Sequence, residues 1–292
     1  MYLLGIDIGT SGCKINVFTL EGNIVSSASR EYSEYSPKPG WTELNPDEVW
    51  NALKASIKEG VSRTPSDEIK ALSFSTLGSE VMVPVDKKGK WVYPAISGYD
   101  ARGEGYQDQL KMWNETLGAL RIFQITGMPM QYNVAANKIL WLRENMPKVF
   151  NKTYKFVSFQ DYLVWKLTGN FAIDYSMASR MMLMDIHKKA WSAEMLNIAN
   201  ISEDMLSDPC PSGVVVGEVS AEVAEEIGLS GGTAVVSGGH DQACGALGVG
   251  VINEGPAMDA TGSVECIAAA MEKPVLTEDM LESKQCCYCH AV

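Results

Sequence analysis

The sequence lacks any long apolar run. No stretch approaches the roughly 18 consecutive apolar residues of a membrane-spanning helix. The N-terminus also shows no basic segment followed by a secretory apolar core. We therefore expect a cytoplasmic protein that contacts no membrane. An excess of positive charge is missing too, because 24 basic residues stand against 36 acidic ones and give a formal net charge of -12. That balance disfavours binding to a phosphate backbone, so nucleic acid is not an expected partner.

Cysteine is present, but not as the dense framework of a small secreted domain. Seven cysteines are scattered along the 292 residues, and this odd, sparse set favours reduced thiols. The stretch CCYCH at 286–290 does contain one C-x-x-C followed by His290. A structural zinc site needs four ligands and no second pair is in view. We therefore favour a buried strand of small residues over a metal site there.

Three short β-type runs open the chain, at residues 2–8, 13–18 and 24–32, separated by GTSG and LEGN. They predict an antiparallel meander. A Walker loop or a dinucleotide fingerprint places its glycines just before a helix, so this strand–turn–strand pattern excludes both. Asp7 ends the first run. An ionised carboxylate there needs either a turn that it caps or a cation opposite it.

The remaining organisation follows from periodicity and punctuation. The stretch NPDEVW predicts a helix that starts with Asn45 as N-cap and Pro46 at the first helical position. The middle of the chain, about 104–200, is expected to be mainly helical and to cap the sheet. A strand at 233–237 then leads into GGHDQACGALGVG, which puts Asp241 near a helix N-terminus. From these residues alone, we favour an N-cap role for Asp241.

A third segment, DATGSVE at 259–265, repeats the strand–turn–strand pattern of the chain's beginning. Two turns rich in glycine and hydroxyls could clamp a polyphosphate between them through backbone N–H groups and side-chain oxygens. Ordinary hairpin turns use the same residue types. The two interpretations therefore have equal weight at this point.

Seven separate segments together resemble the FGGY family of carbohydrate kinases: DIGTSGCK, WTELNPDEVW, SGYDAR, TGMPMQYNVAANKILWL, FQDYLVWKLTGNFAIDYSMASRMMLMDIHKKAW, GGHDQACGALG and DATGS. The similarity runs in family order over essentially the whole chain. It implies an α/β fold of the ribonuclease-H-like, actin-like ATPase type, with a mixed sheet and helical insertions. It also implies the ATP-dependent, Mg²⁺-dependent phosphorylation of a sugar or polyol hydroxyl.

The resemblance implies a phosphate and metal site at the first turn. Asp7 would hold Mg²⁺ through water, which suits an ion that gives up its waters reluctantly. Lys14 would offset the charge of the phosphates. The residues expected to line the β- and γ-phosphates of ATP come from both glycine-containing turns and from the strand after the first: Thr10, Ser11, Gly12, Lys14, Gly262 and Ser263.

By the same resemblance, Asp241 is the catalytic base that accepts the proton of the sugar hydroxyl. Phosphoryl transfer depends mainly on positioning and charge stabilisation, so a weakly basic aspartate suffices. The residues expected to bind the acceptor are Glu80, Asp100, Arg102 and Gln242. Paired carboxylate and guanidinium groups suit a polyol because each can bind two neighbouring oxygens. The alternative for these charged residues is a surface salt bridge.

Two departures from the family pattern concern the size of the acceptor. Ser79 stands where glycerol kinases carry an arginine, and Gly98 stands where a tryptophan precedes the aspartate and arginine. Both changes remove bulk. We therefore expect glycerol to be disfavoured and a longer keto-sugar, polyol or sugar acid to be favoured.

The family pattern also predicts the domain organisation. Residues 1–253 are expected to form the N-terminal domain that binds sugar and carries the catalytic base, and residues 254–292 to begin an incomplete C-terminal nucleotide-binding domain. The expected function is that of a carbohydrate kinase with ATP and a sugar or polyol as partners. The alternative is a catalytically silent sugar-binding fragment or a non-kinase actin-like ATPase relative. A homodimer is an assembly that the sequence leaves open.

Overall fold

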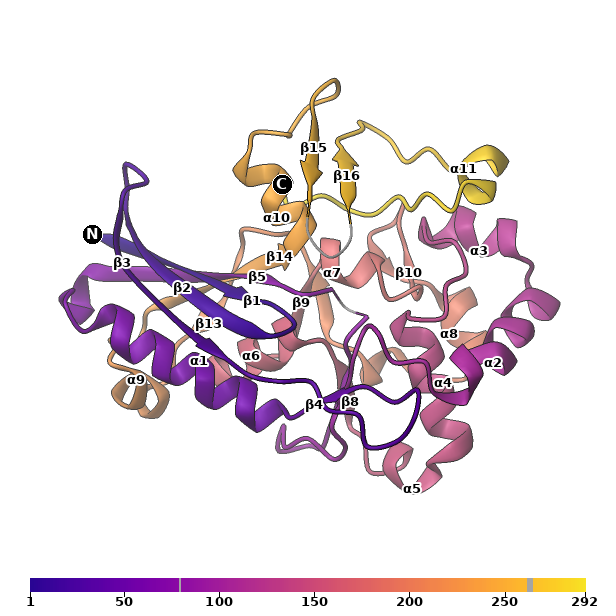
Figure 1. Cartoon of the computed structure of the whole chain (residues 1–292), viewed down its shortest axis with the longest axis horizontal. Coiled ribbons are helices and arrows are strands. Elements are labelled where there is room, and N and C mark those ends of the chain that lie inside the picture. Colours follow the sequence, from indigo (N-terminus) through magenta and orange to yellow (C-terminus); the bar gives the residue numbers. More distant parts are fainter. Residues whose placement is uncertain (79, 262–264) are drawn as a thin grey trace.

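A six-stranded mixed sheet forms the centre of the computed structural model, which describes residues 1–78, 80–261 and 265–292. The strand order is β13-β14-β5-β1-β2-β3 (Figure 1). The strands are β1 (Tyr2–Ile8), β2 (Gly12–Thr19), β3 (Ile24–Glu31), β5 (Ile69–Thr76), β13 (Val215–Glu218) and β14 (Ala234–His240). The first three pair antiparallel, which confirms the predicted meander. Strands β1, β5 and β14 run parallel, so their carboxyl ends meet at one edge of the sheet.

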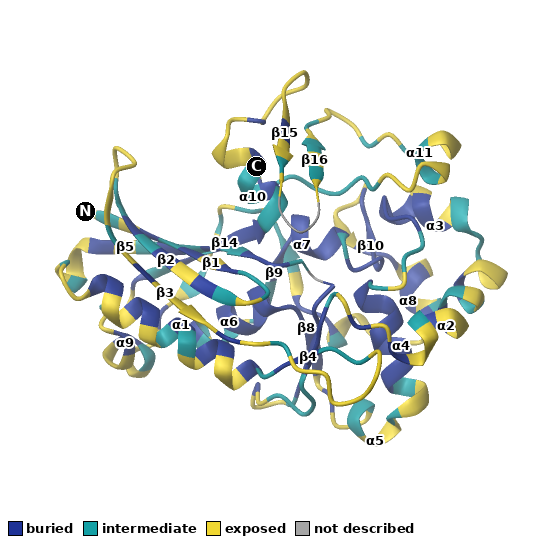
Figure 2. Cartoon of the chain, in the orientation of Figure 1, coloured by how far each residue is buried: buried dark blue, intermediate teal, exposed yellow. Residues whose placement is uncertain are grey.

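One face of this sheet packs on helices and the other is largely open. Leu4, Ile6 and Ile8 of β1 are buried, whereas Leu3 on the opposite face is 40% exposed. The covered face packs against α1 (Pro46–Val61), α6 (Phe159–Thr168) and α9 (Ala221–Ile227). In Figure 2, α1 shows buried positions towards the sheet and exposed ones outside. The alternation of buried and exposed residues along β1 is typical of a strand in a sheet with one covered face.

Helix α1 begins where the sequence predicts. The Asn45 side chain accepts a hydrogen bond from the Asp47 N–H at 3.0 Å, and Pro46 is the first helical residue. Val49, Leu53 and Ile57 are buried along the face that meets the sheet. Their spacing of four residues places them on one side of the helix.

A second lobe lies beyond the edge of the sheet, at the right of Figure 1. It has its own apolar core, built around residues such as Trp113, Ile122 and Leu140. Its helices are α2 (Arg102–Thr116, with positive φ at 103–106), α3 (Ala119–Thr126), α4 (Ala135–Asn145), α5 (Pro147–Phe150) and α8 (Ala193–Ala199). The prediction that the middle of the chain caps the sheet is therefore wrong for these helices, whose apolar side chains pack on one another. It is correct for α6.

Short elements complete the fold. They are β4 (Glu43–Leu44), β6 (Val83–Val85), β7 (Ala95–Ile96), β8 (Lys155–Val157), β9 (Ala172–Asp174), α7 (Tyr175–Ser179), β10 (Met184–Asp185), β11 (Ala190–Trp191), β12 (Asp208–Cys210) and the 3₁₀ turns Ser66–Glu68 and Glu203–Met205. The strands among them pair two by two, as β4–β7, β6–β8, β9–β12 and β10–β11. Glu80 lies in the loop before β6, and Asp100 lies in the loop after β7.

The C-terminal part follows α10 (Asp241–Gly248) with an antiparallel hairpin, β15 (Ala257–Ala260) and β16 (Cys266–Ala269), and with α11 (Glu278–Glu282). The predicted strand at 286–290 is wrong, because this segment runs extended and half-buried without pairing to any described strand. Single contacts hold it instead, since Cys287 N–H donates to the Gly127 carbonyl at 2.8 Å. The predicted domain boundary at 253 stays a prediction. No helix among the described residues is long and apolar enough to cross a bilayer.

Candidate active site

Asp7 lies at the sheet edge where β1, β5 and β14 end. Its side chain is exposed, and Ser75 Oγ of β5 donates to Asp7 Oδ1 at 3.0 Å. Lys14 of β2 stands directly opposite Asp7 in the antiparallel register. Asp7 therefore has a cation on the neighbouring strand. A cavity of about 300 Å³ on this open face is lined by both residues, together with Asn16 and Ser73.

Hydrogen bonds hold the GTSG turn beside Asp7, and the hydroxyls of Thr10 and Ser11 take no part in these bonds. Gly9 N–H donates to the Gly12 carbonyl at 2.9 Å. The Tyr32 hydroxyl donates to the carbonyls of Gly9 and Gly12 at 2.6 and 3.0 Å. A β-carbon on Gly12 would lie 2.8 Å from the Arg30 carbonyl oxygen, so only glycine fits there. Thr10 is half-exposed and Ser11 is exposed at the tip, which suits both for phosphate oxygens.

The donor set at this edge fits a weakly held Mg²⁺. Within residues 1–78, 80–261 and 265–292, no group of three or more His, Cys, Asp or Glu side chains gathers to hold a metal. One exposed carboxylate at Asp7 leaves the remaining positions to water and substrate phosphates, as Mg²⁺ prefers. Gly262 and Ser263, predicted for the second phosphate turn, lie outside the described residues.

Asp241 is the first residue of α10, directly after β14. The N-cap interpretation is wrong, because His240 is the cap and its Nδ1 accepts from the Gln242 N–H at 3.3 Å. The same N–H donates to Asp241 Oδ1 at 2.6 Å, and the Asp241 side chain stays 42% exposed. Partial burial raises the pKa of Asp241 to about 6, and the Glu80 carboxylate adds to that rise while Arg180 opposes it. Such a group can take up a proton near neutral pH.

Gln242 stands next to Asp241 and has unused hydrogen-bonding capacity. Its Oε1 is buried and finds no hydrogen-bond partner in the part of the chain that the structure describes. A buried polar atom without a partner costs free energy, and a ligand hydroxyl can remove that cost. This geometry is compatible with the predicted role of Gln242 in binding the acceptor, which stays a prediction.

Glu80 pairs with Arg180, a residue to which the sequence assigned no role. Arg180 Nε donates to Glu80 Oε1 at 2.9 Å, and Nη2 contacts the same oxygen. Burial alone would raise the pKa of Glu80, but the Arg180 charge outweighs it and lowers the pKa to about 2. His240 lies beside the pair, and burial together with Arg180 lowers its pKa to about 3. We call Glu80, Arg180, His240 and Asp241 the acceptor cluster.

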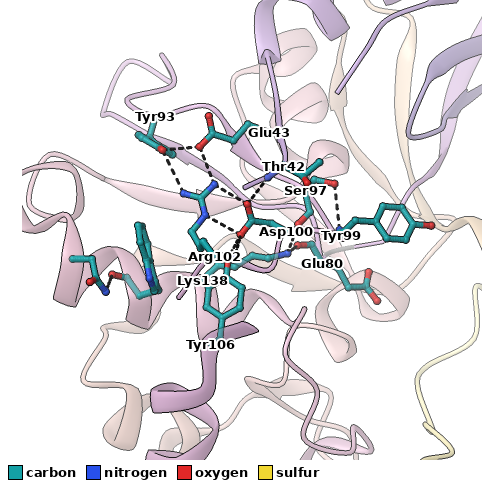
Figure 3. A network of polar contacts seen from close by, with 12 residues as sticks. Thr42, Glu43, Glu80, Tyr93, Ser97, Tyr99, Asp100, Arg102, Tyr106 and Lys138 are labelled. Atoms are coloured by element: carbon teal, nitrogen blue, oxygen red, sulfur yellow. Dashed lines mark hydrogen bonds and ion pairs between the residues drawn. The ribbon is translucent and has the colours of Figure 1, made fainter. Parts of the chain in front are cut away.

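Asp100 and Arg102 form a buried pair (Figure 3). Neither side chain has exposed surface, so the surface salt-bridge alternative is wrong for them. The network around the pair comprises Thr42 N–H and the Tyr106 hydroxyl on Asp100, and Glu43, the Tyr93 hydroxyl and the Trp41 ring around Arg102. Protein groups occupy their polar atoms. Their predicted contact with an acceptor stays a prediction and would require an exchange of partners.

Lys138 connects this network to Glu80. Its buried ammonium donates to the Ser97 carbonyl at 2.8 Å and also to the carbonyl of Glu80 (Figure 3). Burial lowers the pKa of Lys138 to about 7, although the carboxylates of Glu80 and Asp100 oppose that shift. The bridge fixes the backbone of Glu80 relative to the loop that contains Gly98. Lys138 therefore holds the backbone of Glu80 in place, and its ammonium is directed to backbone carbonyls.

Comparison with known proteins agrees with this arrangement. A family model described as "FGGY family of carbohydrate kinases, N-terminal domain" matches residues 2–248. A xylulose kinase from Lactococcus lactis is 36% identical over 271 residues, which cover 92% of this chain and 53% of the relative. A gluconokinase from Bacillus licheniformis is 30% identical over 277 residues, which cover 95% of this chain and 53% of the relative.

A solved structure extends the agreement to the fold. The crystal structure of xylulose kinase from Rhodospirillum rubrum superposes with a TM-score of 0.88 at 24% identity, covering 94% of this chain and 56% of that one. The chain thus spans about half the length of the relatives it matches. The mixed sheet and its flanking helices are those of the actin-like ATPase fold, and the chain belongs to the FGGY family of carbohydrate kinases.

Proposed function

We propose that this chain carries the acceptor site and the catalytic base of an ATP-dependent carbohydrate kinase. The observation that supports this best is the position of two carboxylates at the ends of β1 and β14, the two strands that run parallel to β5 on either side of it. Asp7 ends β1 and Asp241 follows β14, and the Asp7 charge contributes to the raised pKa of Asp241. One side of this edge therefore suits phosphates and the other suits a hydroxyl.

The residues have separate tasks in the proposed reaction. Asp241 accepts the proton of the acceptor hydroxyl while the oxygen of that hydroxyl attacks the γ-phosphorus of ATP. The new O–P bond forms, the bond to the bridging oxygen breaks, and ADP leaves with that electron pair. Thr10, Ser11 and Lys14 bind the phosphates, and Asp7 would hold Mg²⁺ through water. When bound, Mg²⁺ would neutralise phosphate charge.

The acceptor in this proposal is a sugar, polyol or sugar acid longer than glycerol. Glu80 and Gln242 offer hydrogen-bonding groups beside the base, and Gly98 leaves room near Glu80. Among the described residues, a β-carbon at Gly98 would meet only the Glu80 β-carbon, at 3.5 Å. ATP, Mg²⁺ and a cytoplasmic location are part of the same proposal.

A substitution of the base tests this proposal. In the phosphorylating enzyme, Asp241→Asn keeps the shape of the side chain and removes the proton acceptor. We expect turnover to fall by about 10²–10⁴-fold while acceptor binding persists, measured by ADP release and by calorimetry. Asp67→Asn, a change at an exposed aspartate in a 3₁₀ turn, serves as the matched control. Turnover of Asp241→Asn within about tenfold of the control would contradict the assignment.

The alternative, a silent sugar-binding fragment, differs in one measurement. ADP release across a panel of sugars is compared between the 292-residue chain and any longer product of the same gene. Sugar binding without ADP release in every form would favour the silent fragment over the kinase. ADP release that depends on one sugar would favour the kinase.

A further inference from the structure

Arg180 occupies a place in the acceptor cluster that nothing in the sequence analysis assigns. It follows α7 directly and reaches Glu80 across 100 residues of sequence. The two side chains are 15% and 11% exposed, so both are mostly buried but reachable from solvent. Both charges act on the carboxylate of Asp241, whose side chain is 42% exposed. A hydroxyl that reaches Asp241 therefore has the Glu80–Arg180 pair as its neighbour.

Among the residues that the structure describes, the Glu80–Arg180 pair does not use all of its hydrogen-bonding groups. Arg180 Nε and Nη2 both converge on a single oxygen of Glu80, Oε1. Arg180 Nη1 approaches the Cys286 thiol at 3.9 Å, and sulfur is a weak acceptor. A guanidinium carries five N–H donors in a fixed plane. Donors at Nη1 and acceptor capacity on Glu80 are thus offered side by side.

Tyr288 fixes the orientation of the guanidinium. Its ring centroid lies 5.0 Å from Arg180 Cζ, and the ring meets the His240 ring edge-on at 5.6 Å. The segment that carries Tyr288 is held on both sides, because Cys287 N–H donates to Gly127 O at 2.8 Å and Cys289 N–H donates to Ser179 Oγ at 3.1 Å. Stacking on an aromatic face restricts Arg180 without using its in-plane donors.

Charge gives a second reason for an arginine at this position. Glu80 and Asp241 are two carboxylates in one partly buried cluster, and Arg180 acts on both of them. A neutral side chain at 180 would leave Glu80 as an uncompensated buried charge. With the arginine present, Glu80 stays ionised and can accept hydrogen bonds from hydroxyls.

From this geometry we propose that Glu80 and Arg180 together bind two adjacent hydroxyls of the acceptor, and that Tyr288 positions Arg180 for that contact. One hydroxyl donates to the Glu80 carboxylate, and its neighbour accepts from the Arg180 guanidinium. The proposal rests on the proposed kinase function and specifies its substrate as an acceptor longer than glycerol that carries a vicinal diol. It makes Arg180 a specificity-determining residue and Tyr288 a positioning residue.

Deoxy sugars give the sharpest test. Binding of xylulose and of its monodeoxy analogues to the 292-residue chain is measured by calorimetry for the wild type and for Arg180→Met, Arg180→Lys and Tyr288→Leu. We expect the wild type to bind at least one analogue about tenfold or more weakly than xylulose, because a charged hydrogen bond is lost. In Arg180→Met, xylulose binding weakens by a similar factor, and the discrimination against that analogue disappears.

The other variants separate recognition from folding. Arg180→Lys keeps the charge, so we expect it to stay folded and to recover part of the xylulose affinity. Tyr288→Leu keeps the N–H donors of Arg180 but removes the ring that restricts their orientation. We therefore expect a loss of xylulose affinity smaller than that of Arg180→Met. Arg121→Met, which removes an exposed arginine paired with Glu194 at 2.8 Å, is the matched control and should bind like the wild type. Thermal unfolding without ligand shows which variants are folded.

Two negative outcomes have different meanings. If the wild type binds xylulose and a folded Arg180→Met or Arg180→Lys keeps the full discrimination against every deoxy analogue, the diol proposal is overturned while the kinase function stands. If the wild type binds neither xylulose nor any other sugar of the panel, the proposed function itself fails. If Arg180→Met does not fold, Arg180→Lys still tests the proposal. Loss of its discrimination against the deoxy analogue supports the proposal.

Discussion

Arg102 donates to both oxygens of Asp100, through Nε at 2.8 Å and through Nη2 at 2.9 Å. Neither side chain is exposed. Removing one partner of a buried pair leaves the other as an uncompensated charge, which typically costs about 3–5 kcal/mol. We therefore expect Arg102→Met to lower the free energy of unfolding by about that amount, measured by urea denaturation.

The control for this prediction is Arg121→Met, since Arg121 is also paired with a carboxylate but is 53% exposed. Exposed pairs contribute little because water and salt screen them. If Arg102→Met lowers the free energy of unfolding by less than about 1 kcal/mol, the buried pair contributes no more to stability than a surface salt bridge does.

The pH dependence of catalysis should report the environment of Asp241. Burial raises the pKa of its carboxylate to about 6; the Glu80 and Asp7 charges act in the same direction, whereas the hydrogen bond from Gln242 N–H and the Arg180 charge oppose the rise. A general base works only when ionised, so kcat/KM for the acceptor should fall as the pH drops through about 6. His240 does not contribute to this limb, because its pKa is lowered to about 3.

The measurement is a pH profile of kcat/KM in the phosphorylating enzyme, with the acceptor limiting. An acidic limb near pH 4, the ordinary value for an aspartate, would show that burial and Glu80 do not act on the base as the structure indicates. In Arg180→Lys, which keeps the positive charge, the limb should stay close to its wild-type position.

Much of this site follows from local sequence. The strand–turn–strand pattern around GTSG places Asp7 opposite Lys14 in the register, because a short hairpin leaves few alternatives. Gly238 and Gly239 followed by a helical pattern likewise locate Asp241 at the start of α10. In both cases, residues close in sequence determine the geometry.

The acceptor side could not be predicted in the same way. From the sequence, Glu80 could have paired with Arg102. In the structure Arg102 pairs with Asp100, and the Trp41 ring centroid lies 4.0 Å from the Arg102 Cζ. The partner of Glu80 comes instead from Arg180, 100 residues further along the chain. Arg180 follows α7, which packs beside β14, and Glu80 comes after β5, the neighbour of β14 in the sheet. The arginine was visible in the stretch YSMASRMM, but no spacing rule connects it to Glu80.

The metal prediction concerns Asp7. If its carboxylate anchors the waters of Mg²⁺, Asp7→Ala should raise the Mg²⁺ concentration needed for half-maximal activity and slow the transfer. Losses of about 10–100-fold in metal affinity or activity are typical when such outer contacts are removed. The measurement is a Mg²⁺ titration of turnover in the phosphorylating enzyme. Asp67→Ala removes an exposed carboxylate elsewhere and serves as the control. An unchanged Mg²⁺ titration in Asp7→Ala would mean that Asp7 only caps the turn and does not anchor the metal.

Acceptor size gives the last prediction, through Gly98. A side chain at this position would start 3.5 Å from the Glu80 β-carbon, so a tryptophan there would extend along the group that is proposed to bind the acceptor. We expect the wild-type chain to bind a pentulose, hexitol or hexonate but not glycerol, because a three-carbon acceptor leaves hydroxyl-binding groups unpaired. Gly98→Trp should weaken binding of the larger ligand by about tenfold or more, since it removes both space and hydrogen bonds.

A thermal-shift and calorimetric panel on the 292-residue chain checks this prediction. Gly248→Trp is the matched control, because a β-carbon there meets no atom within 4 Å and the position is exposed at the end of α10. Both variants add the same side chain, but only Gly98→Trp adds it beside Glu80. If glycerol proves the best ligand, or if Gly98→Trp binds the larger ligand as tightly as Gly248→Trp does, the space beside Glu80 does not determine acceptor size.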